Sequence, residues 1–200
     1  ITVAMGLDTG VITPNSTLYS AGHIKVYDRI IKDSSEAPKG TKTIEDLVAY
    51  SGNVGMVVIG SRIDAKVFHN YLDRVGMGKK TGIDTFAEMS PKLLSLKDLT
   101  AVRKSNVSFG QGIAMTQIQM ITSINAVVNN GKLMKPYLVD RLEDYRGNII
   151  KQNSPVVVRK VFEDDTSRRV RQYMEAVVTK GTGKGVQIKG YRIGGKTGTA

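Results

Sequence analysis

Two apolar stretches predict neighbouring helices in the first third of the chain. Thr43-x-x-Asp46 resembles a capping box with Asp in place of Glu, and the apolar residues after Thr43 predict a helix that ends beside Ser51. A second helix is expected to begin at Asn53. Its strongly apolar run, which is typical of a helix buried in the middle of a domain, contains Val54, Val57, Val58 and Ile59.

Asp64 can cap a third helix, for which Gly76 and Gly78 supply a C-terminal stop. The residues that follow the three-four spacing of its apolar face are Phe68, Tyr71, Leu72 and Val75. Turn formers and polar residues then separate short apolar groups. Residues 79–108 are therefore expected to be loop, with one short helix after Ser95.

The strongest helix signal lies after this loop. Thr116-x-x-Gln119 is a complete capping box, and Asn130-Gly131 supplies a stop. The face expected to define this helix consists of Ile118, Ile121, Ile124 or Asn125, and Val128.

A hairpin and a last helix are predicted next. Segments 135–142 and 149–151 flank the turn formers Tyr145–Asn148, and their short, charged strands indicate a peripheral ribbon. A helix is expected to start at Asp165 or Thr166. The residues that share its apolar face are Val170, Met174, Val177 and Val178.

Glycines 181, 183, 185 and 190 mark a turn region, after which residues 191–193 are expected to form a strand leading into Gly194–Thr199. Helix signals thus outnumber strand signals along the chain. We predict an α+β fold class that is mainly helical, with one partial domain accounting for residues 1–200.

Composition narrows the class of protein only partly. At 40% apolar, 200 residues can form one domain with a core or a large piece of a bigger domain. No run reaches the ~18 apolar residues that would cross a bilayer, so any membrane anchor is expected outside these residues. The absence of cysteine excludes disulfides and a thiol nucleophile.

A net charge of +11 indicates a polyanionic partner, which could be nucleic acid, an anionic membrane surface or anionic cell-wall polymer. Nucleic acid is disfavoured, because the basic residues are dispersed, aromatic residues are only 6%, and no nucleic-acid-binding pattern occurs. Salt-dependent binding in a DNA shift assay would be needed to support that reading.

No metal or cofactor is expected. The two histidines, His23 and His69, have no carboxylate or histidine partner at helical metal spacing. The acidic residues considered as a glycosidase pair are better interpreted as caps and turns, and these are Asp33, Glu36, Asp64 and Asp84.

Two short motifs carry the candidate chemistry. In Lys196-Thr197-Gly198-Thr199, a cation, two hydroxyls and a residue without a side chain are suited to gripping a substrate carboxylate. Ser51-Gly52-Asn53 lies between two predicted helices, where Asn53 could also simply cap the second helix. Each motif alone is short enough to arise by chance.

Together, and in this order, the motifs resemble two of the three elements of penicillin-recognising serine acyltransferases. Further segments resemble the monofunctional, class B penicillin-binding proteins. They are Gly82–Asp84, Ser108–Ile113, Thr116–Gln119, Asn130–Lys132 with Pro136-Tyr137, Gly181–Gly183 and Lys196–Ala200. The resemblance covers essentially the whole chain.

One element of the family is missing. No nucleophilic Ser-x-x-Lys occurs in the sequence, and Ile1–Leu7 resembles the helix directly behind that lysine. The resemblance implies a transpeptidase domain truncated at both ends, with most of its antiparallel sheet absent and only the strand ending near Thr199 retained. Alone, this fragment is expected to be inactive.

The resemblance also implies roles for individual residues. Ser51 and Lys196 would be catalytic, with Ser51 relaying a proton and Lys196 supplying positive potential. The substrate-binding residues would be Asn53, Thr197, Gly198 and Thr199. Asn53 would bond the substrate amide, Thr197 and Thr199 would hold the terminal carboxylate, and the Thr199 N–H would form half of an oxyanion hole.

The implied activity is D,D-transpeptidation of peptidoglycan stem peptides, with acylation by β-lactams. The parent protein would be anchored in the membrane of a bacterial cell envelope, face the outside, and associate with the cell-wall synthesis machinery. A non-enzymatic penicillin-sensing or scaffold homologue of the same fold remains the alternative, because the two differ at the nucleophile.

Overall fold

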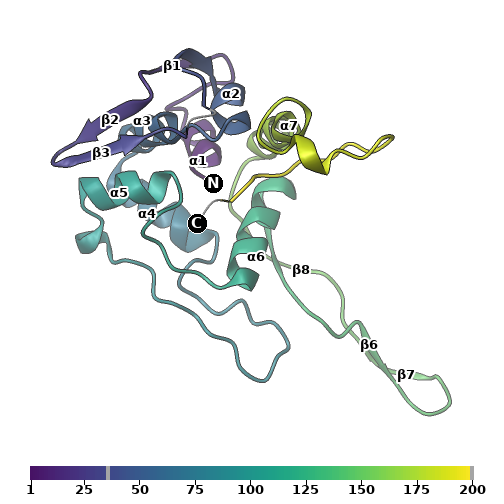
Figure 1. Cartoon of the computed structure of the whole chain (residues 1–200). Coiled ribbons are helices and arrows are strands. Elements are labelled where there is room, and N and C mark those ends of the chain that lie inside the picture. The colour runs from purple at the N-terminus through teal and green to yellow at the C-terminus, as the bar shows by residue number, and fades with distance from the viewer. Residues whose placement is uncertain (35–36, 199–200) are drawn as a thin grey trace.

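A computed structural model describes residues 1–34 and 37–198 (Figure 1). The α-helices are α1 (Thr2–Asp8), α2 (Ile44–Ala49), α3 (Asn53–Arg62), α4 (Ala65–Arg74), α5 (Ala101–Ser108), α6 (Gln117–Val128) and α7 (Asp164–Thr179). Two short 3₁₀ helices are η1 (Leu96–Asp98) and η2 (Lys184–Val186). The strands are β1 (Thr17–Ser20), β2 (His23–Val26), β3 (Arg29–Lys32), β4 (Gly40–Thr43), β5 (Lys132–Lys135), β6 (Arg141–Glu143), β7 (Ile149–Gln152) and β8 (Val156–Lys160).

The described strands form antiparallel pairs, β1 with β4, β2 with β3, β5 with β8, and β6 with β7. Each pair is a separate two-stranded sheet, and helices contribute more of the described residues than strands do. The mainly helical α+β prediction is therefore confirmed. The five-stranded sheet expected of the complete family fold is not built by residues 1–34 and 37–198.

The prediction of a single retained strand ending near Thr199 was wrong. Eight short strands are present among the described residues, whereas residues 187–198 contain none. An extended segment becomes a strand only when a neighbouring ladder satisfies its backbone. Here the segment instead contacts α7 near Met174, whose carbonyl accepts from the Gly195 N–H at 3.1 Å. Thr199 itself lies outside the described residues.

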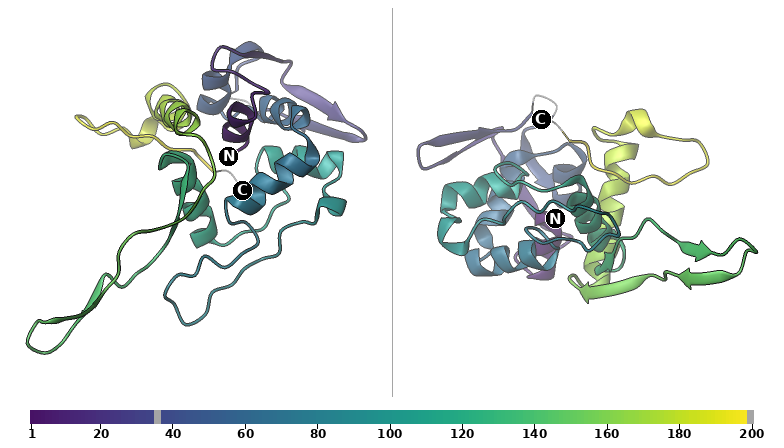
Figure 2. Two further views of the ribbon diagram at one scale, coloured as in Figure 1. Left: turned by 180° about the vertical axis from the view of Figure 1, so that it is seen from behind. Right: turned by 90° about the horizontal axis from the view of Figure 1, so that it is seen from below.

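Helix α1 lies in the middle of the helical part, packed against α3 and α7 (Figure 2). Val3, Ala4 and Met5 are at most 5% exposed, which places this short helix in the core. At Gly6, an added Cβ would come within 2.8 Å of the Ile59 side chain. Close approach of α1 to α3 thus depends on a residue without a side chain.

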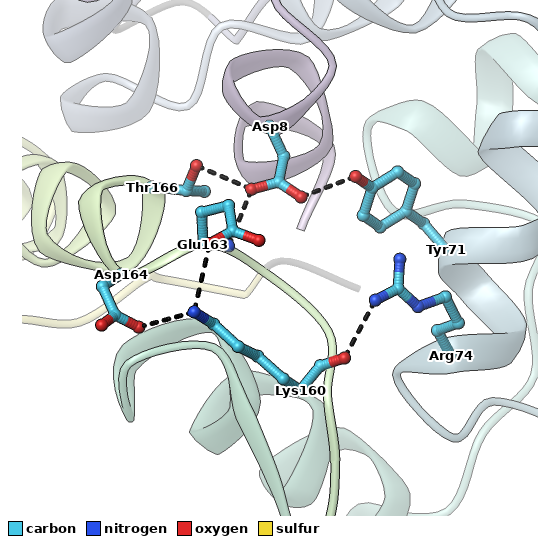
Figure 3. A network of polar contacts seen from close by, with 7 residues as sticks. All are labelled: Asp8, Tyr71, Arg74, Lys160, Glu163, Asp164 and Thr166. Atoms are coloured by element: carbon cyan, nitrogen blue, oxygen red, sulfur yellow. Dashed lines mark hydrogen bonds and ion pairs between the residues drawn. The ribbon is translucent and has the colours of Figure 1, made fainter.

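A polar network joins the end of α1 to two other helices (Figure 3). The Asp8 carboxylate accepts hydrogen bonds from the Tyr71 hydroxyl at 2.6 Å, the Glu163 N–H at 2.8 Å and the Thr166 hydroxyl at 2.9 Å. Burial and the Asp8 carboxylate raise the pKa of Tyr71. The same carboxylate therefore binds α4 and satisfies donors at the start of α7.

The predicted helix starts are largely confirmed. Thr43 and Asp64 accept hydrogen bonds at the starts of α2 and α4, and α3 begins at Asn53 as expected. Helix α7 begins at Asp164, one residue before the predicted start. The expected loop at residues 79–108 was partly wrong, because Thr100 caps α5 within it.

Helix α6 has the predicted capping box, but its predicted buried face was wrong. Ile121 is 66% exposed, while Gln119 and Ser123 are at most 1% exposed. The Gln119 amide donates to the Lys79 carbonyl at 2.8 Å, and the Ser123 hydroxyl donates to the Val75 carbonyl at 2.9 Å. These bonds satisfy loop and helix-end carbonyls, and so they bury a polar face that hydropathy alone misses.

The predicted ribbon is confirmed. Strands β6 and β7 pair around a turn in which the Asp144 carboxylate accepts from the Arg146 and Asn148 N–H groups. The ribbon projects away from the helical part (Figure 1). Within residues 1–34 and 37–198, no helix is long and apolar enough to span a bilayer.

Candidate active site

Ser51 is held on a tight turn between α2 and α3. Its φ of +55° lies in the left-handed region, which a serine adopts only at a cost. Two backbone bonds fix this turn, from the Ser51 N–H to the Val48 carbonyl at 3.3 Å and from the Gly52 N–H to the Leu47 carbonyl at 2.9 Å. The Ser51 hydroxyl is thereby presented from a strained but defined backbone.

Lys196 reaches this hydroxyl from the opposite end of the sequence. Its Nζ donates a hydrogen bond to Ser51 Oγ and another to the Thr197 carbonyl at 3.1 Å. Desolvation lowers the pKa of Lys196, although the residue as a whole remains accessible to solvent. The two motifs are thus brought into direct contact, with a cation beside a hydroxyl.

Asn53 is the first residue of α3, and Gly52 occupies the N-cap position. The interpretation of Asn53 as the cap was therefore wrong. Its Nδ2 donates to the Lys32 carbonyl at 2.9 Å, which fixes the direction of the amide. The second amide hydrogen and the amide oxygen have no bond to the described residues, and they can serve a substrate amide.

Asp33 supplies the cap that Asn53 does not. Its Oδ1 accepts from the Val54 N–H at 2.8 Å, and its Oδ2 accepts from the Ser20 hydroxyl at 2.5 Å. A carboxylate at a helix N-terminus also complements the helix dipole. The residues after β3 therefore position the start of α3, and with it Asn53.

Thr197 and Gly198 directly follow Lys196, and both are exposed. Thr197 Oγ1 is 2.9 Å from Thr182 Oγ1 and 3.4 Å from Lys196 Nζ. A Cβ added to Gly198 would meet none of the described residues within 4 Å. Thr199, the other expected carboxylate ligand, lies outside the described residues.

The start of α1 lies within electrostatic reach of Lys196. Burial, followed by the Lys196 ammonium, lowers the pKa of the Ile1 α-amino group to about 6. A third segment of the sequence is thus in the neighbourhood of the Ser51–Lys196 pair.

The other residues considered as functional have structural roles. Asp64 caps α4, and Asp84 accepts from the Leu138 and Val139 N–H groups. His69 Nε2 lies 2.7 Å from the Leu94 carbonyl. Glu36 lies outside the described residues, and the described ones contain no group of three or more His, Cys, Asp or Glu arranged for a metal ion.

Sequence reasoning missed two residues around the site. Asp33 was interpreted as a cap or turn residue, but its link to the helix that carries Asn53 was not foreseen. Thr182 was noted only as part of a glycine-flanked segment, and its contact with Thr197 was not foreseen. Neither contact has a local sequence signal, because the partners are 21 and 15 positions away.

The site places the Lys196 ammonium against the Ser51 hydroxyl and near the exposed Thr197 hydroxyl. The cation favours the deprotonated form of the Ser51 hydroxyl, which suits that group for proton relay. The ammonium and the Thr197 hydroxyl together suit a carboxylate ligand. The site is therefore equipped for proton transfer next to a bound anion.

Comparisons with known proteins identify the family of the chain. Residues 1–200 match the family described as "Penicillin binding protein transpeptidase domain". The chain is 33% identical to stage V sporulation protein D of Bacillus subtilis (strain 168), covering 100% of this chain and 31% of that protein. It is 28% identical to the peptidoglycan D,D-transpeptidase FtsI of Escherichia coli (strain K12), covering 99% of this chain and 32% of that protein.

Solved structures show the same fold. Penicillin binding protein 3 from Mycobacterium tuberculosis, complexed with aztreonam, matches with a TM-score of 0.89 at 25% identity, covering 100% of this chain and 46% of that one. A peptidoglycan glycosyltransferase from Burkholderia ambifaria matches with a TM-score of 0.85 at 26% identity, covering 100% and 60% respectively. The chain spans about a third of the length of the curated relatives it matches.

Proposed function

The chain belongs to the penicillin-binding protein transpeptidase domain family, and from that premise we propose that it supplies part of the active site of a peptidoglycan D,D-transpeptidase. That enzyme cross-links stem peptides by serine acyl transfer and is acylated by β-lactams. The observation that carries the proposal is the hydrogen bond from Lys196 Nζ to Ser51 Oγ. It joins two motifs that lie 145 positions apart in the sequence.

In the proposed reaction, a serine outside the 200 residues attacks the carbonyl of the penultimate D-Ala. The peptide C–N bond breaks, and the terminal D-Ala leaves with a proton relayed through Ser51. An amine of a neighbouring stem peptide then attacks the ester, forms the cross-linking amide and returns the serine proton. The nucleophile is proposed to join the site near the start of α1, because the Lys196 ammonium is near enough to lower the pKa of the Ile1 α-amino group.

The other residues are proposed to bind and orient the substrate. Asn53, whose amide is directed by the Lys32 carbonyl, would bond the substrate amide. Lys196 and the Thr197 hydroxyl would hold the terminal carboxylate, with Gly198 leaving room for it. Thr199 is proposed to add a second hydroxyl and an oxyanion-hole N–H.

The proposed setting of the protein follows from the position of its substrate. Peptidoglycan lies outside the cytoplasmic membrane, so we propose that the natural protein acts in the cell envelope, held by a membrane anchor elsewhere in its sequence. Association with the cell-wall synthesis machinery is proposed with it. Substitution of the anchor by a soluble tag should release the protein from the membrane fraction.

A fluorescent penicillin tests the proposal on the natural protein that contains these residues. A stoichiometric covalent adduct in intact mass is expected, and Ser51→Ala should slow its formation by about a hundredfold, because the proton relay is lost. Ser61→Ala removes an exposed hydroxyl on α3 whose only bond to the described residues is to the Val58 carbonyl, and it should leave the rate unchanged.

A cross-linking assay with peptidoglycan strands completes the test. Cross-linked product together with the adduct supports the transpeptidase. An adduct without product would instead support a penicillin-sensing homologue, and neither signal from a folded protein would support a scaffold. The isolated 200-residue chain is expected to form no adduct, because it has no Ser-x-x-Lys. A stoichiometric adduct would place the nucleophile inside this chain.

A further inference from the structure

The turn after α7 touches both motif-carrying segments. The Thr182 N–H donates to the Ala49 carbonyl at 3.0 Å, two positions before Ser51. Its hydroxyl oxygen is 2.9 Å from Thr197 Oγ1 and 3.4 Å from the Ala49 carbonyl. A single residue outside both motifs therefore contacts the end of α2, which leads to Ser51, and the hydroxyl beside Lys196.

The turn is closely fitted to the end of α2. At Gly181, an added Cβ would lie 2.1 Å from the Ala49 carbonyl oxygen, so no larger residue can occupy this position. Lys180 Nζ lies 2.7 Å from a Glu45 carboxylate oxygen and 2.8 Å from an Asp46 one. These contacts hold Thr182 in place independently of its own side chain.

The direction of the hydrogen bond between Thr182 and Thr197 decides whether the Thr197 hydroxyl hydrogen is available to a ligand. If Thr182 donates to Thr197 Oγ1, the hydrogen of the exposed Thr197 hydroxyl is free to bond a ligand. Either hydroxyl can be the donor in this pair, and the Thr182 hydroxyl can also donate to the Ala49 carbonyl at 3.4 Å. Because a carboxylate only accepts hydrogen bonds, a carboxylate bound to Thr197 requires the arrangement in which Thr182 donates to Thr197.

We propose that Thr182 is a positioning residue that directs the Thr197 hydroxyl toward the substrate carboxylate. The inference rests on the proposed function, because it assumes that Thr197 binds that carboxylate. Thr182 touches neither the substrate nor the reacting atoms. Its loss should therefore weaken binding of the carboxylate-bearing ligand and leave the chemical step nearly unchanged.

Thr182→Val in the natural full-length protein tests this role, because it removes only the hydroxyl and keeps the N–H bond to Ala49. The apparent dissociation constant for a penicillin should rise about fivefold to tenfold, the size of one hydrogen bond, while the limiting acylation rate changes less than about twofold. Thr182→Ser should restore binding. Thr179→Val, an exposed position at the end of α7, is the matched control and should change neither constant.

A double-mutant cycle separates positioning from general destabilisation. In a Thr197→Val background, Thr182→Val should have no further effect on binding, because the hydroxyl that it directs is gone. Additive losses, or equal losses in Thr182→Val and Thr179→Val, would overturn the proposal. If the wild-type protein forms no adduct, the proposed function fails; if it does and Thr182→Val binds penicillin normally, only the role of Thr182 fails.

Discussion

Lys196 Nζ donates a hydrogen bond to Ser51 Oγ across 145 positions of sequence. The bond joins the turn between α2 and α3 to the C-terminal segment, residues 187–198, which contacts α7 near Met174. A positive charge next to a hydroxyl lowers the cost of moving a proton through that hydroxyl. The first two predictions concern this pair.

Removal of the Lys196 charge should slow acylation. In the natural protein, Lys196→Ala is expected to lose about 3 kcal/mol of transition-state stabilisation, about a hundredfold in the acylation rate. Stopped-flow measurement with a chromogenic β-lactam gives the rate. Lys189→Ala, an exposed lysine on the same segment, is the control and should react normally. Near-normal acylation of Lys196→Ala would remove this residue from the mechanism.

The pH dependence of the acylation rate should show the loss of charge on Lys196. Desolvation lowers the pKa of Lys196, so its charge is lost at a pH below the ordinary lysine value of about 10.4. Because the cation assists acylation, the rate should fall as pH rises through that lowered pKa. Lys196→Arg keeps its charge to higher pH and should shift this decline upward. An alkaline decline at the same pH in wild type and variant would assign it to another group.

Asp33 should matter for both stability and binding. Asp33→Ala removes the acceptor for the Val54 N–H at the start of α3, at a cost of about 1 kcal/mol, the typical value for a lost N-cap. Asn53 would lose its fixed position, so penicillin affinity should fall with stability. Thermal unfolding and penicillin titration measure the two effects. Asp28→Ala, whose ion pair with Arg29 is exposed at 3.8 Å, should change neither, and an equal response would refute the assignment.

The Asp8 network should contribute stability without chemistry. Asp8→Ala removes the acceptor of three hydrogen bonds and leaves the Tyr71 hydroxyl without its partner, so a loss of about 3 kcal/mol is expected. Chemical denaturation measures the loss. Tyr71→Phe in the Asp8→Ala background should then cost less than in wild type, because that hydroxyl is already unpaired. Strictly additive losses would show that the two groups are not coupled.

The sequence by itself determined the class of fold, most of the helix starts and the two motifs. These features depend on local chemistry. The side chains of Thr43, Asp64 and Thr116 accept hydrogen bonds from backbone N–H groups two or three residues away, so a short stretch of sequence is enough to predict them. The motifs of Ser51 and Lys196 were recognised by residue type and order. Such signals need no knowledge of the rest of the chain.

Tertiary structure alone decided the contacts that assemble the site. The buried face of α6 includes Gln119 and Ser123 because distant carbonyls accept their hydrogen bonds, and residues 187–198 are not a strand because no described strand pairs with them. Asp33 caps a helix 21 positions away, and Thr182 meets Thr197 only after α7 folds against α2. Hydrogen bonds between separate segments depend on how those segments pack, and no local pattern of residues encodes that packing.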